Sequence, residues 1–161
     1  MPAAKRSAGI LLYRRAAAGP EVLLVHPGGP FWVGRNAGAW SIPKGEHGDD
    51  EDPQVCARRE FAEETGTELP PGELVELGTV RQKNGKWVSA WAAEGDLDAA
   101  AITSNTFELE WPPRSGQTQT FPEVDRAGWF SLEEAREKLN PAQTAFLDRL
   151  AQLLAGAGAS A

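Results

Sequence analysis

The chain alternates short apolar runs with polar, glycine-rich stretches, a pattern that predicts several strands and a few helices. Each apolar run has the length of one strand and is bounded by turn-forming residues. The stretch from Pro27 to Ala39 is glycine-rich and predicts an irregular loop. The predicted strands are Ser7–Arg14, Glu21–His26, Ala39–Ile42, Glu73–Gln82, Trp87–Glu94 and one that ends the segment Phe121–Phe130, with Thr106–Trp111 as a further candidate.

Capping residues predict three helices. Asp52 can cap the first of them, Pro53 suits its first turn, and Gly66 is placed where it would end. Ser131 and Glu134 form a capping box that opens a second helix to about Leu139. After Asn140 and Pro141 a third helix follows, whose apolar residues recur at helical spacing: Phe146, Leu147, Leu150, Leu153 and Leu154. We expect the tail from about residue 155, with the sequence GAGASA at its end, to be disordered.

Two connections are unusual. Between the fourth and fifth strands, Asn84-Gly85 predicts a two-residue type I′ hairpin turn. Arg81, Lys83 and Lys86 at this turn either contact substrate phosphates or protect a sheet edge. The segment Gly95–Pro122 is long and irregular, and connections of this kind are usually functional or mobile.

Large aromatic residues in two of these loops are candidates for nucleotide binding. Trp111 offers a stacking surface for a base. Trp32 lies in the glycine-rich loop, where binding and packing across the sheet edge are equally good interpretations.

Length and composition predict one domain over residues 1–161, with an ordinary apolar fraction of 41%. The net charge of −7 would repel duplex nucleic acid. The single cysteine, Cys56, excludes an intramolecular disulfide. No run approaches the roughly 20 apolar residues of a spanning helix, so we expect no membrane partner and a cytoplasmic location. The sequence does not determine an oligomeric state.

The chemistry concentrates in residues 45–67, which are rich in carboxylates. Glu60, Glu63 and Glu64 are spaced i, i+3 and i+4, so their side chains share one face of the predicted helix. Three like charges held together cost free energy unless a positive charge lies among them. Mg²⁺ prefers oxygen ligands and is often shared with substrate phosphates, so it suits this face. A solvated acidic helix face is the alternative, and so is a structural Ca²⁺ site in residues 46–52.

This stretch resembles the Nudix box, G-x5-E-x7-R-E-U-x-E-E-x-G-U, where U is a bulky aliphatic residue. Phe61 fills the first U position acceptably, and Thr67 departs from the last one. The remaining matching residues are Gly45, Glu51, Arg59, Glu60, Glu63, Glu64 and Gly66. The order of predicted elements is also similar to that of the Nudix fold. Both indicate an α/β/α sandwich with a central mixed β-sheet.

The resemblance implies a hydrolase that cleaves a pyrophosphate bond in a nucleoside diphosphate linked to another group, X. Mg²⁺ would be the cofactor, with Mn²⁺ as a substitute. Glu60, Glu64, Glu63 and the Gly45 carbonyl are the expected ligands. Arg59 and Glu51 would orient them.

The general base stays open at this point. Glu123 is the best candidate outside the box, because some MutT-type members have an additional metal-linked glutamate at the corresponding place. Glu60 or Glu63 is the alternative inside the box, with Glu108 and Glu110 behind.

Lys44 precedes the box and is either a phosphate-binding cation or a solvated surface lysine. The phrase WSIPKGE resembles the diadenosine polyphosphate hydrolase branch. We therefore expect a small nucleotide as partner, either a nucleoside triphosphate or a dinucleoside polyphosphate. Sugar nucleotides and diphosphoinositols stay open as alternative substrates. A non-catalytic nucleotide-sensing module is the competing hypothesis.

Overall fold

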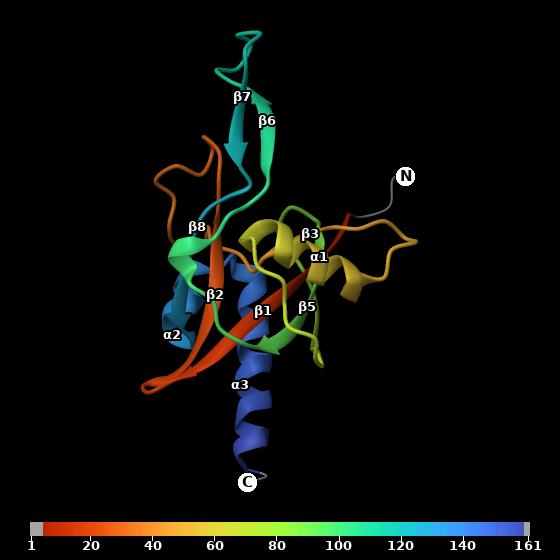
Figure 1. The fold of residues 1–161 in the computed structure, drawn as a ribbon, viewed down its shortest axis with the longest axis vertical. Coiled ribbons are helices and arrows are strands. Elements are labelled where there is room, and N and C mark those ends of the chain that lie inside the picture. Colours follow the sequence, from red (N-terminus) through yellow and green to blue (C-terminus); the bar gives the residue numbers. More distant parts are fainter. Residues whose placement is uncertain (1–4, 160–161) are drawn as a thin grey trace.

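A central β-sheet flanked by helices forms the body of the structure, a computed structural model that describes residues 5–159 (Figure 1). Strands β1 to β4 are Arg6–Ala16, Gly19–Pro27, Lys44–Glu46 and Val75–Arg81. Strands β5 to β8 are Trp87–Glu94, Thr106–Glu110, Thr118–Pro122 and Val124–Ser131. The helices are α1 (Pro53–Thr65), α2 (Leu132–Lys138) and α3 (Thr144–Ala159), with short 3₁₀ turns η1 at Ala99–Ala101 and η2 at Pro141–Gln143.

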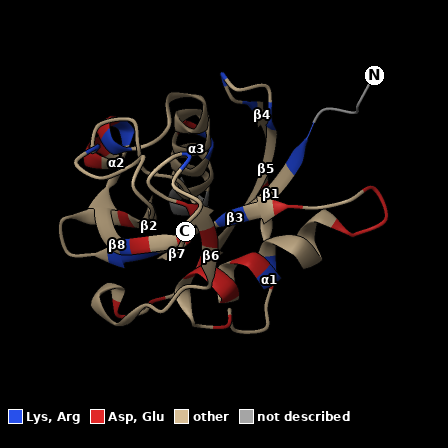
Figure 2. Ribbon diagram, turned by 90° about the horizontal axis from the view of Figure 1, so that it is seen from above, with Lys and Arg blue, Asp and Glu red and all other residues tan. Residues whose placement is uncertain are grey.

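The main sheet is mixed, with the strand order β4-β5-β1-β2-β8. β1 pairs parallel with β5, and the other strand pairs of this sheet are antiparallel. β3 pairs with the N-terminal part of β1, where Gly9 faces Lys44. Helix α1 covers one face of the sheet, and α2 and α3 cover the other (Figure 2). The predicted α/β/α sandwich with a central mixed sheet is confirmed.

Strand β1 is buried on both faces, which explains why its sequence is a continuous apolar run. Leu11 and Tyr13 belong to the cluster that α3 covers, together with Phe146 and Leu150. The alternate residues Ala8, Ile10 and Leu12 belong to the cluster on the other face, together with Cys56 and Phe61 of α1.

The segment Ala39–Ile42 is not a strand, contrary to the prediction. Its contacts with strands and helices are isolated bridges, Val25 with Ser41 and Trp40 with Leu139. The Ile42 N–H donates to the Gln143 side chain at 3.0 Å instead of to a strand. The third strand begins later, at Lys44, because Pro43 has no N–H to donate.

The hairpin between β4 and β5 has a different turn from the one predicted. Gly85 has a φ of 88°, but Asn84 is not among the positive-φ residues, so a type I′ turn is excluded. The Gly85 N–H donates to the Gln82 carbonyl at 2.9 Å, and the Gln82 N–H to the Lys86 carbonyl at 2.9 Å. This is a three-residue turn with glycine in the left-handed position.

The segment predicted to be irregular contains a second, two-stranded sheet. β6 and β7 pair antiparallel, with Phe107 opposite Phe121, and the hairpin projects away from the main sheet (Figure 1). Its strands are short and largely exposed, with mainly polar residues in β7. Strand β6 agrees with the candidate strand Thr106–Trp111, whereas β7 was not predicted, because it is largely exposed and mainly polar.

Helix α3 extends further than predicted. It continues to Ala159, so the described part of the tail is helical, where a disordered tail from about residue 155 was expected. Residues 160–161 lie outside the described residues. Alanine is the best helix former, which offsets the two glycines in this stretch. Across residues 5–159, no helix has the length and apolar character needed to span a membrane.

Gly66 ends α1 in a way that no other residue type would tolerate well, and this makes a testable prediction. Its φ is 74°, and a Cβ placed there would come within 2.9 Å of the Thr103 carbonyl oxygen. We expect Gly66→Ala to lower the free energy of unfolding by about 1–3 kcal/mol, measured by urea denaturation. Gly72→Ala is the control, because a Cβ there would meet nothing within 4 Å. Equal losses in both variants would contradict this account of the helix end.

Candidate active site

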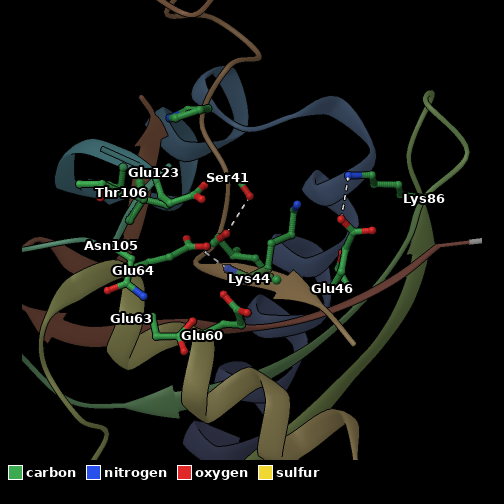
Figure 3. Close-up of a pocket in the computed structure, with 16 residues that line it drawn as sticks. Ser41, Lys44, Glu46, Glu60, Glu63, Glu64, Lys86, Asn105, Thr106 and Glu123 are labelled. Carbon is green, nitrogen blue, oxygen red and sulfur yellow. Dashed lines mark hydrogen bonds and ion pairs between the residues drawn. The ribbon is translucent and has the colours of Figure 1, made fainter. Parts of the chain in front are cut away.

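A cavity of about 450 Å³ opens at the end of the sheet where β1 and β3 meet helix α1 (Figure 3). The three predicted carboxylates of α1 line it, and Glu123 lines it from the position between β7 and β8. The remaining polar residues of its wall are Ser7, Ser41, Lys44, Glu46, Lys86, Asn105 and Thr106. The cavity therefore joins chain segments that are far apart in the sequence.

Helix α1 is fixed at both ends, which determines where its acids point. At its start the Asp52 carboxylate accepts the Gln54 N–H at 2.8 Å. At its end the chain returns and caps it: the Thr103 N–H donates to the Thr65 carbonyl at 3.1 Å, and the Asn105 N–H to the Glu63 carbonyl at 3.0 Å. Carbonyls that a helix end leaves unpaired are thus satisfied by the loop that leads to β6.

The same loop positions Glu123. The Glu123 N–H donates to the Asn105 carbonyl at 2.8 Å, and the Glu123 carbonyl accepts the Gly28 N–H at 3.0 Å. A chain of backbone hydrogen bonds thus connects α1 to Glu123. This connection brings Glu123, the candidate base outside the box, to the same cavity as the acids of the helix.

Arg59 is the positive charge that holds the acidic residues together. Its guanidinium lies 3.1 Å from Glu51, 3.1 Å from Glu60 and 3.3 Å from Glu63. The hydrogen bond to Glu51 is the main reason that the pKa of Arg59 is raised. Arg59 therefore contacts Glu51 as well as two of the expected metal ligands, and its orienting role stays a prediction.

Burial makes charge costly on the inner side of this cluster. It raises the pKa of Glu64 to about 8, although the nearby positive charge of Lys44 acts in the opposite direction. Burial also raises the pKa of Glu60, with repulsion from Glu63 as the next cause, and it lowers the pKa of Lys44. The Lys44 backbone N–H donates to the Glu64 carboxylate at 3.4 Å.

Gly45 leaves the space that Glu60 occupies. A methyl group added at Gly45 would collide with the Glu60 carboxyl group. The φ of Gly45 is not positive, so the requirement is one of space and not of backbone conformation. The Gly45 carbonyl lies 3.5 Å from the Cys56 sulfur, and burial raises the pKa of that thiol to about 11, so Cys56 is a neutral packing residue.

The donor set fits a hard divalent cation. Carboxylate oxygens are the ligands that Mg²⁺ prefers, and a cation would relieve the repulsion that raises the pKa of Glu60. Within residues 5–159 no three acidic, histidine or cysteine side chains already surround one point. Arg59 instead engages Glu60 and Glu63 directly. The acids are gathered on one wall of the cavity without forming a closed coordination shell.

Other predicted site residues lie away from the cavity wall. The Arg35 guanidinium lies 5.8 Å from the ring of Trp32, and the Arg81 guanidinium lies 5.4 Å from the ring of Trp87. Trp111 packs edge-on against Phe31 at 5.5 Å. None of the predicted substrate-binding residues Trp32, Arg81 and Trp111 lines the cavity, and neither do Glu108 and Glu110.

The sequence interpretation overlooked Ser7 and Asn105. Ser7 is a polar residue at the start of an apolar strand, which was the available signal. Asn105 acts through its backbone, so its side-chain type carried no signal. Lys86 lines the cavity, whereas Arg81, which was predicted to bind substrate, does not.

Comparison with solved structures shows the fold. The Ap4A hydrolase of C. elegans, solved as a binary complex, matches with a TM-score of 0.67 and 23% identity, over 93% of this chain and 98% of that one. A mutT/nudix family protein from Listeria innocua matches with a TM-score of 0.65 and 18% identity, over the whole of both chains. The NUDIX domain of Shewanella oneidensis NrtR, complexed with ADP ribose, matches with a TM-score of 0.64 and 16% identity, over 96% of this chain and 90% of that one.

Comparison of sequences gives the family. The RNA pyrophosphohydrolase of Caulobacter vibrioides is 46% identical over 50 residues, which are 28% of this chain and 29% of the length of that protein. The family model for the NUDIX domain matches residues 3–150, nearly the whole chain. This protein is therefore a member of the NUDIX domain family.

Proposed function

We propose that this protein hydrolyses a pyrophosphate bond in a nucleoside diphosphate linked to another group, X, with the help of a divalent metal ion. The observation that carries the proposal is the convergence of four carboxylates on one cavity. Glu60, Glu63 and Glu64 come from α1, and Glu123 comes from a segment about 60 positions away in the sequence. A pure binding site has no need of this mutual repulsion.

The proposed substrate is a nucleoside triphosphate or a dinucleoside polyphosphate. Support comes from the names of similar proteins, an Ap4A hydrolase and an RNA pyrophosphohydrolase. Further support comes from Lys44, a cation in the wall of the same cavity that can hold a phosphoryl oxygen.

Glu60 and Glu64 would hold the ion, with Glu63 close to them and the Gly45 carbonyl as a further candidate. When bound, Mg²⁺ or Mn²⁺ supplies the positive charge that stabilises phosphoryl oxygens during the displacement. Arg59, anchored by Glu51, holds Glu60 and Glu63 toward each other.

Proton removal from the attacking water falls to a carboxylate that faces the cavity. Glu123 is the preferred general base, because it lines the cavity without an ion pair to Arg59. Glu63 and Glu60 are the alternatives, and both are engaged by Arg59. A free carboxylate can accept a proton more readily than one that is held in an ion pair.

The function is tested by a substrate panel of nucleoside triphosphates, dinucleoside polyphosphates and nucleotide sugars. Each compound is incubated with Mg²⁺, with Mn²⁺ and with EDTA, and the products are identified by mass. We expect metal-dependent cleavage of at least one polyphosphate. Binding without turnover by folded protein, unaffected by Glu64→Gln, would instead support a nucleotide-sensing module.

Removing the proposed base should slow the chemical step. We expect Glu123→Gln to lower kcat by about 10²–10⁴-fold with little change in KM, because the amide cannot accept the proton. Glu108→Gln is the matched control, since Glu108 is a glutamate of the exposed hairpin outside the cavity. A kcat for Glu123→Gln close to that of the control would exclude Glu123 and direct the assignment to Glu63 or Glu60.

Filling the space at Gly45 should weaken metal binding. In Gly45→Ala the added methyl displaces the Glu60 carboxyl group, so we expect the Mg²⁺ concentration for half-maximal rate to rise about 10–100-fold. The measurement is the rate as a function of Mg²⁺ at saturating substrate. Gly72→Ala serves as control, and an unchanged Mg²⁺ requirement in Gly45→Ala would argue against Glu60 as a ligand.

A further inference from the structure

The Ser7 hydroxyl is buried in the cavity wall without a partner. Ser7 is 2% exposed and lines the cavity. Within residues 5–159, its oxygen is the one buried side-chain polar atom that has no hydrogen-bond partner. Buried hydroxyls are normally hydrogen-bonded, so this one is available to a ligand in the cavity.

Strand pairing places Lys44 on the same side of the sheet as Ser7, and it brings the start of β5, next to Lys86, beside Ser7. Ser7 lies opposite Glu46 of β3 and opposite Val88 of β5. Lys44 precedes Glu46 by two residues within β3, and side chains two apart along a strand point to the same face. Lys86 lies in the turn immediately before β5, two residues before Val88. Both lysines line the cavity with Ser7.

The charge at this end of the cavity is positive, in contrast to the wall formed by α1. Lys86 and Lys5 both lie 3.6 Å from the Glu46 carboxylate, so two cations share one anion. Among the described residues Lys44 makes no ion pair within 4.0 Å. Figure 3 shows Glu46 and Lys86 on one side of the cavity, Glu63, Glu64 and Glu123 on the other, and Lys44 between them.

We propose that Ser7, Lys44 and Lys86 form an anion subsite that binds a phosphoryl group of the substrate on the side of the cavity opposite Glu63 and Glu123. Phosphate oxygens accept hydrogen bonds, and the subsite offers one hydroxyl and two ammonium donors. Glu46 competes with the phosphoryl group for Lys86. The carboxylates opposite repel a phosphate that carries no metal, so a metal-free anion prefers the lysine end.

The subsite determines the substrate class, and in this it rests on the proposed function. The bond between two phosphoryl groups lies at the carboxylate end of the cavity. A further phosphoryl group can then reach the lysine end. Nucleoside triphosphates and dinucleoside polyphosphates have such a group, whereas nucleotide sugars with two phosphates do not. The protein therefore selects compounds with three or more phosphates in a row.

The test is the binding of inorganic tripolyphosphate in EDTA, measured by titration calorimetry. We expect Ser7→Ala to weaken binding about tenfold through the loss of a hydrogen bond to a charged group. Lys86→Met should weaken it similarly, and Glu46→Gln should strengthen it severalfold, because Lys86 is then released to the anion.

Two matched controls keep wild-type affinity. Ser89→Ala removes a hydroxyl on the neighbouring strand that bonds to Thr79 outside the cavity. Lys83→Met removes a lysine from the turn before β5, also outside the cavity. Wild-type affinity in Ser7→Ala or Lys86→Met, or unchanged affinity in Glu46→Gln, overturns the subsite. If Ser7→Ala does not fold, Lys86→Met and Glu46→Gln decide.

The outcome is separable from that of the proposed function. Tripolyphosphate binding in EDTA needs neither metal nor turnover, so it can succeed while nucleotide hydrolysis fails. When both succeed, Ser7→Ala should reduce the ratio of kcat/KM for a nucleoside triphosphate over that for a nucleotide sugar. A ratio equal to that of Ser89→Ala would show that the subsite takes no part in substrate selection.

Discussion

Repulsion among carboxylates that are partly removed from water is the constraint on which the rest of the site depends. Glu60, Glu63 and Glu64 stand on adjacent turns of α1, and Glu64 is buried deeply enough to raise its pKa to about 8. Such an arrangement is stable only with compensating positive charge. Arg59 supplies part of it from the same helix, with Glu51 holding its other edge. The remainder is the role that a divalent cation would take.

The fold meets this constraint by fixing α1 from both sides. Its buried residues, such as Phe61, pack on one face of the sheet, so the helix cannot rotate its acids into solvent. The loop that carries Asn105 closes its C-terminal end and also positions Glu123. A single set of backbone hydrogen bonds thus sets the distance between the acids of the helix and the acid beyond it.

The cavity has two chemically different ends because two structural layers meet there. The helix contributes carboxylates, while the strands β1, β3 and β5 contribute a hydroxyl and lysines. Glycine at position 9 allows this meeting, because a Cβ there would clash with the backbone of Pro43 and the side chain of Lys44. β3 can therefore cross close to β1, and it places Lys44 and Gly45 between the two ends.

The predictions from sequence agree with the structure where a feature depends on residues close together in the chain, and fail where it depends on distant residues. Helix α1 with its caps, the capping box at Ser131, and the two long strands near the N-terminus depend on neighbouring residues, and all of them were predicted. The prediction of a type I′ turn at Asn84 was wrong because the loop has three residues and not two, and hydrogen bonds between Gln82 and Lys86 and between Gly85 and Gln82 close it. The candidate strand Thr106–Trp111 is β6, but its partner β7 was missed because it is exposed and mainly polar and leaves no apolar pattern. Trp32, Arg81 and Trp111 were predicted to bind substrate from their residue types and their places in loops and turns. Their side chains instead pack against Arg35, Trp87 and Phe31.

The sequence by itself determined the identity and the spacing of the acidic residues, because helical periodicity places Glu60, Glu63 and Glu64 on one face whatever surrounds them. It also determined that the apolar side of each helix packs against the apolar strands, since burial of apolar surface drives folding. Tertiary structure alone decided that Glu123, and not Glu108 or Glu110, reaches the cavity, and that Ser7 and Lys86 stand opposite the acids. These placements depend on strand register and loop closure between residues far apart in the chain, which no local pattern specifies.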